Sequence, residues 1–279
     1  MVRSDILGEI DLDLCLRSGQ AFHWIQLGET YVIVSGHRVW QVFEREDYWE
    51  VTGSQPEALR HYLDGDRDYN KINMALKEDL SLALLVERGR GLRILNQEIW
   101  DTVVAFILST NNSVKKIQSS ILKISQAYGD RLGTFSGQDI YSLPSPQRLA
   151  QVDPEDLRVQ GKTGYRDKYL VESAKMIASG QVDLEGLRGQ EAHQIRKELM
   201  TLPGVGPKAA ECILLFGYGC RSSFPVDVWI ERTMQTLYGP FSSREEISSF
   251  GRKKFGPQAG YVQQLLFHYG RTHKNEFEI

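Results

Sequence analysis

The chain has 279 residues, of which 41% are hydrophobic, so it can bury a large core that we expect to be divided between two domains. Residues 1–10 carry three charges and no long apolar run, so we expect neither a signal peptide nor a membrane-spanning segment. The three cysteines, Cys15, Cys212 and Cys220, are too few and wrongly spaced for a four-thiolate iron–sulfur cluster or a disulfide framework.

The net charge of −3 is divided unevenly along the sequence. Residues 1–90 hold 10 Lys and Arg against 16 Asp and Glu, a balance of −6, whereas residues 91–279 hold 23 against 20, a balance of +3. A surface that attracts anions is therefore expected in the second part of the chain.

Short β-rich runs occupy the first part of the chain. Residues 31–34 (YVIV), 39–43 (VWQVF) and 48–51 (YWEV) are separated by Gly, Asp and Glu turns, which is typical of an antiparallel meander. Helical spacing of apolar residues dominates beyond residue 90, and only residues 133–146 resemble a long loop. We predict an α+β N-terminal domain with an antiparallel sheet over residues 1–90, followed by a mostly α-helical domain over residues 91–279.

The most informative segment is LPGVGPK at residues 202–208, which runs into an apolar helical stretch. A glycine turn that opens a helix aims unpaired backbone N–H groups and the positive end of the helix dipole at one point, where a phosphate is favoured. Gly204 and Gly206 provide the turn, and Pro207 suits the first helical position. The segment therefore predicts a backbone clamp for an anion.

Lys208 falls in the first turn of this helix, and Asp227 follows it after a proline turn. The helix dipole and the apolar neighbours Ala209 and Ala210 favour the neutral, nucleophilic form of the lysine amine, and Asp227 offers a carboxylate for chemistry at a sugar. Taken singly, Lys208 is better interpreted as a phosphate contact, and Asp227 as the N-cap of a helix that begins at Val228; the two together, with the further motifs, favour catalysis.

Four further motifs accompany this segment in a fixed order. They are LRSGQAFHW at 16–24, FILSTNNS at 106–113, GYRDKY at 164–169 and AGYVQQLLF at 259–267. With the hairpin, Lys208 and Asp227, the chain resembles the helix-hairpin-helix DNA glycosylases, and within them the 8-oxoguanine DNA glycosylase/AP lyase family. The resemblance implies that the small α+β domain packs on the helical domain, with DNA crossing the cleft between them.

The resemblance also implies an activity. The enzyme would turn 8-oxoguanine out of duplex DNA, excise it through a Schiff base on Lys208 and cleave the strand by β-elimination, as a step of base excision repair. Asp227 would orient or deprotonate the amine and stabilise positive charge on the sugar.

The family pattern assigns a set of residues to the pocket for the extruded base. These are Gly19, Cys212, Phe216, Pro225, Gln263 and Phe267. Phe267 and Cys212 would sandwich the purine, and Gln263 would read its Watson–Crick edge. The Gly19 carbonyl would accept the N7 proton that 8-oxoguanine has and guanine lacks. Without the resemblance, Phe267 and Cys212 are better interpreted as core residues and Gly19 as a turn residue.

A second set of residues would bind DNA. These are Asn111, Lys116, Tyr165, Arg166, Gly204 and Gly206. Asn111 and Tyr165 would fill the gap and wedge the duplex, with Arg166 beside the orphaned base, although Asn111 is also typical of a helix-ending turn.

Two positions depart from the family pattern. Lys116 stands where eukaryotic-type members carry an arginine that contacts the estranged cytosine, so we expect a weaker preference for cytosine opposite the lesion. Trp229 stands where a phosphate-contacting histidine is usual, and an indole N–H donates one hydrogen bond but carries no charge. We therefore expect a weaker phosphate contact there.

Two other functions stay open at this point. One is a monofunctional glycosylase of the alkylated-base type that uses Asp227 and water, and the other is a non-catalytic helix-hairpin-helix DNA-binding protein. Lys208 argues against the first, and the pocket residues argue against the second.

The resemblance also extends to cofactors and partners. It implies no required cofactor and no iron–sulfur cluster, and it suggests a structural monovalent cation on the backbone carbonyls of Met200, Leu202 and Val205. The expected partner is double-stranded DNA containing 8-oxoguanine, with no membrane and with the protein as a monomer. The expected location is the cytoplasm, with the nucleoid, in a bacterium and the nucleus in a eukaryote.

Overall fold

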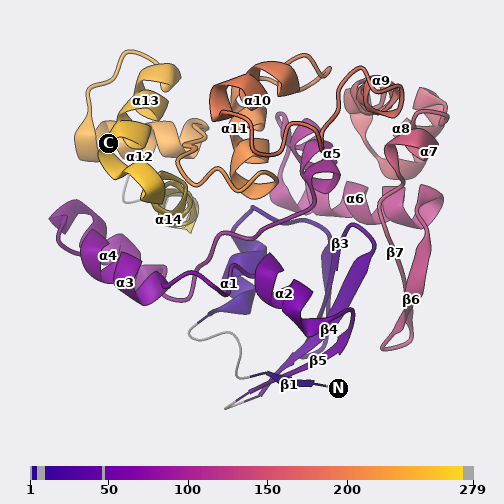
Figure 1. Ribbon diagram of the computed structural model, residues 1–279, viewed down its shortest axis with the longest axis horizontal. Helices are drawn as coiled ribbons and strands as arrows, with labels where there is room; N and C mark the ends of the chain where they lie inside the picture. Colours follow the sequence, from indigo (N-terminus) through magenta and orange to yellow (C-terminus); the bar gives the residue numbers. More distant parts are fainter. Residues whose placement is uncertain (1, 5–9, 46–47, 273–279) are drawn as a thin grey trace.

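The computed structural model, which describes residues 2–4, 10–45 and 48–272, places an antiparallel sheet beneath a broad layer of helices (Figure 1). The sheet has five strands in the order β1-β5-β4-β3-β2, so sequence neighbours pair along most of it, as in a meander. The strands are β1 Val2–Ser4, β2 Trp24–Leu27, β3 Thr30–Ser35, β4 Arg38–Glu44 and β5 Trp49–Gly53. The predicted antiparallel sheet is therefore confirmed, with β1 and β2 as additional strands.

Strand β3 lies at the centre of two apolar layers and is buried along its whole length. One face carries Ile33, which pairs with Trp40 of β4 and belongs to the main core. The other face carries Val32 and Val34, which pack with Ile140 from a distant segment. Because both faces are covered, the run YVIV is apolar throughout rather than alternating.

The distant segment is a second, two-stranded sheet where we expected a loop. Strands β6 Arg131–Phe135 and β7 Gln138–Tyr141 form a hairpin, so the prediction of a loop over residues 133–146 is wrong. Ser136 and Gly137 both have positive φ, 47° and 79°, as a two-residue hairpin turn requires. Several turn-forming residues in this segment favour a loop over a strand when the sequence is considered alone. The pairing of β6 with β7 is stabilised by the apolar layer on β3.

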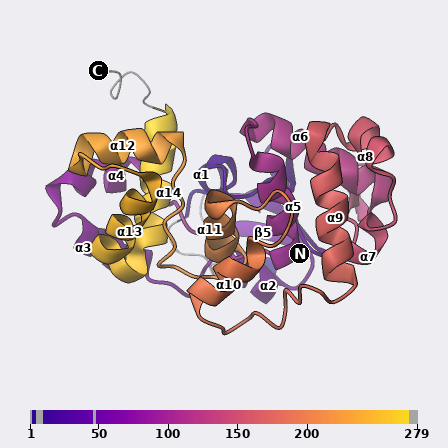
Figure 2. The same ribbon diagram turned by 90° about the horizontal axis from the view of Figure 1, so that it is seen from above.

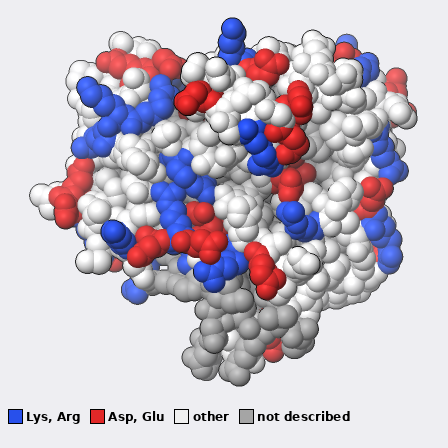
Figure 3. All heavy atoms as spheres, viewed as in Figure 1, with Lys and Arg blue, Asp and Glu red and all other residues white. Residues whose placement is uncertain are grey.

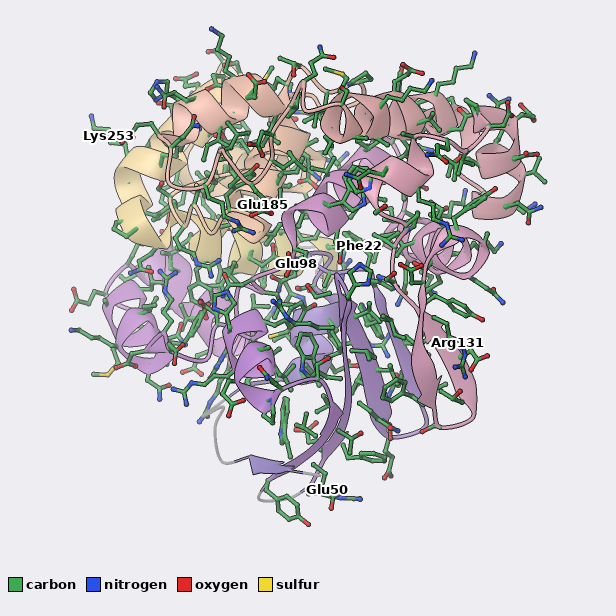
Figure 4. All side chains as sticks on the ribbon, turned by 45° about the vertical axis from the view of Figure 1, so that its right-hand side comes forward. Phe22, Glu50, Glu98, Arg131, Glu185 and Lys253 are labelled. Carbon is green, nitrogen blue, oxygen red and sulfur yellow. The ribbon has the colours of Figure 1, made fainter. Side chains whose placement is uncertain are left out.

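Two buried helices form the centre of the helical layer. Helix α5 Ile99–Ser109 is almost entirely buried and packs against α11 Pro207–Phe216, which is buried along most of its length. Phe22 lies where the sheet meets this layer (Figure 4), with its ring edge-on to Phe106 at 6.0 Å between centroids. The core thus connects α5 with α11 and with Phe22, which closely follows Gly19 in the sequence.

The other helices surround this centre (Figure 2). Seen from above, α12 to α14 lie on one side and α7 to α9 on the other. Their bounds are α1 Leu12–Arg17, α2 Pro56–Tyr62, α3 Tyr69–Leu76, α4 Leu80–Arg88, α6 Val114–Tyr128, α7 Pro146–Leu149, α8 Pro154–Gly161, η1 Gly164–Arg166, α9 Asp167–Ala178, α10 Ala192–Leu199, α12 Val228–Tyr238, α13 Arg244–Phe255, η2 Gly256–Gln258 and α14 Ala259–Thr272. None of the helices in the described ranges is long and apolar enough to cross a bilayer.

Helices α3 and α4 come before residue 90 but lie beside the C-terminal helices (Figure 1). The Tyr261 hydroxyl of α14 donates to Asn73 Oδ1 at 2.9 Å, and Lys254 Nζ lies 3.0 Å from Asp79 Oδ2. One apolar core runs through both parts of the chain. The boundary predicted after residue 90 therefore does not coincide with a gap in the packing.

Candidate active site

The predicted anion clamp is a hairpin between α10 and α11. Gly204 has φ +83° and lies so close to Tyr169 that an added Cβ would be 3.0 Å from its side chain, so glycine is required there. Gly206 is the N-cap of α11 and offers no side chain for capping, and the space around it is open. The first N–H groups of α11 are thus left for a ligand.

A groove of about 1020 Å³ runs past this hairpin. It is formed by the junction of α5 and α6, the start of α11, the start of α12 and the end of α14. Its charged lining residues are Lys115, Lys208, Arg244, Arg271 and Asp227, so positive charge prevails. On the face of the molecule in Figure 3, Lys and Arg lie interspersed with Asp and Glu. The excess of positive charge along the groove favours a polyanion there.

Lys208 lines the groove and also a smaller recess beneath it. Its Nζ lies 5.1 Å from the centre of the Phe106 ring. Burial raises the pKa of the neighbouring Cys212 thiol to about 11, although the nearby Lys208 amine acts in the opposite direction. Cys212 is therefore a neutral, buried thiol at physiological pH, and Lys208 is the lysine that lines both the groove and the recess.

Asp227 lines the same groove and recess and also begins α12. Its Oδ1 accepts the backbone N–H groups of Trp229 and Ile230, both at 3.0 Å, so the N-cap interpretation is confirmed as a structural role. These two bonds use only Oδ1. Capping and catalysis are therefore compatible, because the cap holds the carboxylate in one orientation beside Lys208.

The recess carries most of the residues expected around the base. Its lining is Gly19, Phe106, Lys208, Cys212, Phe216, Asp227, Gln263, Gln264 and Phe267. Its free volume is about 20 Å³, which is room for one water molecule and not for a purine. A Cβ added to Gly19 would lie 3.0 Å from Phe267 Cε1, so the Phe267 ring rests against the glycine in the wall of the recess.

The Gly19 turn is held from several directions. Gly19 has φ +83°, and the adjacent Gln20 side chain donates to the Arg93 carbonyl at 2.8 Å and accepts from the Leu95 N–H at 2.9 Å. Gln264 Nε2 donates to the Ser18 carbonyl at 2.8 Å. The peptide that carries the Gly19 carbonyl is therefore fixed before any ligand binds.

Gln263 is the polar side chain of the recess whose hydrogen bonding is incomplete. It is 5% exposed, and its Oε1 has no hydrogen-bond partner among the described residues. A buried amide oxygen without a partner is costly, and a ligand that donates to it removes that cost. Gln263 is therefore suited to reading the edge of a base.

The two halves of the sequence match known families. Residues 6–103 match the 8-oxoguanine DNA glycosylase N-terminal domain, and residues 104–257 match the HhH-GPD superfamily of base excision DNA repair proteins. The chain belongs to this superfamily. A probable N-glycosylase/DNA lyase of Methanothermobacter thermautotrophicus is 34% identical over 215 residues, which cover 70% of this chain and 68% of the relative. The family resemblance seen in the motifs is confirmed.

Longer alignments and a solved complex agree with this membership. An N-glycosylase/DNA lyase of Arabidopsis thaliana is 30% identical over 282 aligned positions, 93% of this chain and 77% of the relative. The Clostridium acetobutylicum 8-oxoguanine glycosylase/lyase, in complex with double-stranded DNA containing cytosine opposite 8-oxoguanine, superposes with a TM-score of 0.90 at 32% identity. That superposition covers 95% of this glycosylase and 93% of the other chain.

Several expected residues of the glycosylase lie away from the recess and groove. Pro225 is buried but does not line either of them, and Val226 lines the groove instead. Lys116 is exposed outside the groove lining, which Lys115 joins in its place. Trp229 does line the groove, and Arg232 Cζ lies 5.6 Å from the centre of its ring, so a charge accompanies the indole.

The residues expected to form the wedge come from the junction of α5 and α6 and from η1, which contacts it. Asn111 is exposed, lines the groove and has φ +49°. Tyr165 is half exposed, and its hydroxyl donates to the Thr110 carbonyl at 3.3 Å. Arg166, in contrast, is only 7% exposed.

Sequence reasoning missed two members of the recess. Phe106 lies beneath the Lys208 ammonium and stacks on Phe216 at 5.7 Å between centroids. Gln264 anchors the Gly19 turn. Phe106 lies in the motif FILSTNNS and Gln264 in AGYVQQLLF, and this membership is the sequence feature that could have indicated them. Their roles depend on contacts between segments far apart in the sequence.

Proposed function

We propose that this chain is a bifunctional 8-oxoguanine DNA glycosylase and AP lyase that acts through a Schiff base on Lys208. The observation that carries the proposal is the position of Lys208 and Asp227 at the mouth of a recess whose walls include Gly19, Cys212 and Gln263. The recess opens from a basic groove, which matches a duplex with one nucleotide turned inward.

The proposed chemistry uses only groups of the chain and the substrate. The neutral amine of Lys208 forms a bond to C1′, the N-glycosidic bond breaks, and its electron pair leaves with the base, which takes up a proton. The sugar ring then opens as the pair of the C1′–O4′ bond moves to O4′, which takes up the proton held by Asp227, leaving a protonated imine between C1′ and Nζ. That imine acidifies C2′, so loss of a C2′ proton expels the 3′ phosphate by β-elimination.

Asp227 has two tasks in this scheme. Its carboxylate takes the proton that Lys208 must lose and stabilises positive charge that develops on the sugar. Since its Oδ1 is held by the Trp229 and Ile230 N–H groups, the carboxylate does not have to be reoriented during the reaction.

Borohydride trapping tests the proposal directly. The protein is incubated with a duplex that carries one 8-oxoguanine opposite cytosine, with and without borohydride. We expect strand cleavage without the reductant and a covalent protein–DNA adduct with it. An abasic but unbroken strand would instead indicate a monofunctional glycosylase, and an unchanged strand would indicate a DNA-binding protein without catalysis.

For the hairpin we propose a bound monovalent cation on the carbonyls of Met200, Leu202 and Val205. Met200 is the C-cap of α10, where the last carbonyls lack helical partners and the dipole is negative, so this neutral oxygen set suits an alkali ion. Thermal unfolding in potassium, sodium and tetramethylammonium chlorides tests it. Equal midpoints in all three salts would contradict the site. The same samples, examined by sedimentation, test our expectation of a monomer.

A further inference from the structure

We propose that Glu211 is a positioning residue that fixes Asp227 relative to Lys208. Its buried carboxylate joins the helix that carries the amine to the segment that carries the acid. Glu211 lines neither the groove nor the recess, so it acts through the backbone of that segment and not on the DNA. This inference rests on the proposed function, because it concerns the geometry of the two groups that would carry out excision.

Glu211 connects α11 to the chain just before Asp227. It lies three residues after Lys208 on this helix, about one turn further along. Its side chain is only 8% exposed, and its Oε2 accepts the backbone N–H of Phe224 at 3.1 Å. Phe224 precedes Asp227 by three residues, a stretch that spans at most about 11 Å. The hydrogen bond therefore fastens the start of this stretch to the helix that carries Lys208.

The backbone of Phe224 is held at its carbonyl as well as at its N–H. The carbonyl accepts the Ser248 hydroxyl of α13 at 2.8 Å, and Arg252 donates to the same hydroxyl at 2.6 Å. The Phe224 side chain is fully buried, and a Cβ added to Gly251 would lie 2.6 Å from its ring, so α13 packs directly against it. Because the ring of Pro225 also fixes the next φ, the segment starts from a fixed point.

The other carboxylate oxygen of Glu211 is held by two positive charges. Oε1 lies 3.4 Å from Arg196 Nε of α10 and 3.5 Å from Arg252 Nη1 of α13. Both arginines also pair with Glu245, at 3.1 and 3.3 Å, which closes a ring of four charges over α10, α11 and α13. A buried carboxylate is unfavourable unless it is paired and hydrogen-bonded, and this one is both. The ring therefore holds Glu211 with Oε2 toward Phe224.

Single-turnover excision of 8-oxoguanine at saturating protein tests this assignment. Glu211→Met removes both the charge and the acceptor, whereas Glu211→Gln keeps an oxygen for the Phe224 N–H. Glu245→Met is the matched control, because Glu245 pairs with the same two arginines and has no bond to Phe224 among the described residues. We expect Glu211→Met to slow excision roughly tenfold to 100-fold, as misplacement of a positioned group does. Glu245→Met should match the parent, and Glu211→Gln should lie closer to the parent than Glu211→Met does. If Glu211→Gln or Glu245→Met is as slow as Glu211→Met, the effect comes from charge and the inference is overturned.

A double variant separates the positioning of Asp227 from general damage to the fold. If Glu211 acts through Asp227, adding Glu211→Met to Asp227→Asn should slow excision by no more than about twofold, because the positioned group has already lost its charge. The same loss in both backgrounds would overturn the inference. Should Glu211→Met not fold, Ser248→Ala releases the Phe224 carbonyl instead, and its loss in the two backgrounds is judged by the same criterion.

Amide hydrogen exchange distinguishes failure of this inference from failure of the proposed function. If the parent protein excises nothing, the proposed function is wrong. The anchoring of Asp227 is still measured by the exchange of the Trp229 and Ile230 amides, which donate to its Oδ1. We expect both amides to exchange roughly tenfold faster in Glu211→Met, and at the parent rate in Glu245→Met. Unchanged exchange in Glu211→Met would overturn the inference.

Discussion

Lys208 lies next to the proposed phosphate clamp, but phosphate binding and attack on the sugar depend on different atoms. The proposed clamp consists of backbone N–H groups of α11, whereas the proposed nucleophile is the side-chain amine of Lys208. Lys208→Gln should therefore abolish base release and borohydride trapping while the duplex still binds. Gel-shift titration and trapping with the same 8-oxoguanine duplex measure both properties. If the variant releases the base at near the parent rate, the Schiff-base mechanism is wrong.

Two substitutions at Asp227 separate its role as the N-cap of α12 from its proposed role in excision. Asp227→Asn keeps an oxygen that can accept from Trp229 and Ile230, so the fold should be retained, yet excision should slow by about 100-fold or more. Asp227→Ala should lose the cap as well, at about 1 kcal/mol of unfolding free energy. Single-turnover rates and urea unfolding give the two readouts. Equal excision rates in Asp227→Asn and the parent would restrict Asp227 to the capping role.

A buried carboxyl on α5 predicts a pH effect on stability. Burial raises the pKa of Asp101 to about 7, although its Oδ2 accepts the Gly36 N–H at 2.7 Å. Between the ordinary value of 3.8 and about 7 the folded state binds the proton more tightly, so stability falls as the pH rises through that window. Asp101→Asn should thus be more stable than the parent at pH 8, by on the order of 2 kcal/mol, and similar at pH 4.

Urea unfolding of the parent and Asp101→Asn over this pH range is the measurement. Burial lowers the pKa of His23 to about 4, so its contribution to stability rises with pH and opposes that of Asp101. His23 is present in both proteins, so its contribution cancels when the free energy of unfolding of one protein is subtracted from that of the other. Parallel stability curves for the two proteins would contradict the role of Asp101.

Some site residues are positioned by their neighbours in the sequence, and others are positioned by contacts with distant segments. Gly204, Gly206 and Lys208 belong to one short segment whose turn and helix start are encoded by adjacent residues, so their arrangement could be predicted. The engagement of Arg166 with Thr110 joins residues 56 positions apart, and no local pattern encodes it. The resemblance alone assigns Pro225 to the pocket, and its burial away from the lining of the groove and the recess could not be deduced from the sequence.

At the level of elements, the hairpin offers a clean test of the clamp. Gly206 has negative φ and open space around its Cα, so a side chain there is compatible with the fold. Gly206→Glu places a carboxylate at the positive end of α11, which favours the helix but excludes a phosphate. We expect weaker binding to damaged and intact duplexes alike, a shallower dependence on salt, and an unfolding midpoint no lower than that of the parent.

Gly206→Ser is the matched control, because it adds a neutral capping side chain of smaller size. Binding is measured by fluorescence anisotropy between about 50 and 200 mM salt, the range over which phosphate contacts dominate affinity. Unchanged affinity of Gly206→Glu would mean that the duplex crosses the protein elsewhere.

The strands of the two sheets differ in how far their own residues indicate them. The apolar runs of β3, β4 and β5 are long enough to indicate strands without any tertiary information. The pair β6 and β7 is short, with a bulge near Gly133, and is stabilised against Val32 and Val34 of β3. Its structure depends on a partner about a hundred residues away, so its own residues indicate a loop.

For the whole molecule, the continuous core predicts a single unfolding transition. Arg221 lies 3.0 Å from Asp64 and also bonds to Asn96, so it ties the helical part to the N-terminal part across a largely buried contact. Arg221→Met should lower the free energy of unfolding by roughly 3 kcal/mol, because it leaves Asp64 without its charge partner. Tryptophan fluorescence and circular dichroism should nevertheless report coincident urea transitions in both proteins. Two separated transitions in the parent would show that the parts unfold independently.

The order of the two parts could be predicted from composition and periodicity, and it is confirmed. The packing of α3 and α4 against α14 could not, because it brings together residues 188 positions apart. Such contacts arise from the apolar faces that remain once the local elements have formed.

The recess beside Phe267 has a free volume of about 20 Å³, so it must widen before it can hold a purine. A protein whose binding-competent conformation is a minor population binds a ligand with an affinity reduced by that fraction. Free 8-oxoguanine offers only its own contacts against this reduction, whereas a nucleotide in DNA adds the contacts of the groove. The excised base loses the contacts of the groove once it is released from the DNA, and the recess has room for one water molecule and not for a purine. Accumulated product should inhibit this enzyme weakly, and mimics of the base alone should be poor inhibitors unless they keep the ring displaced.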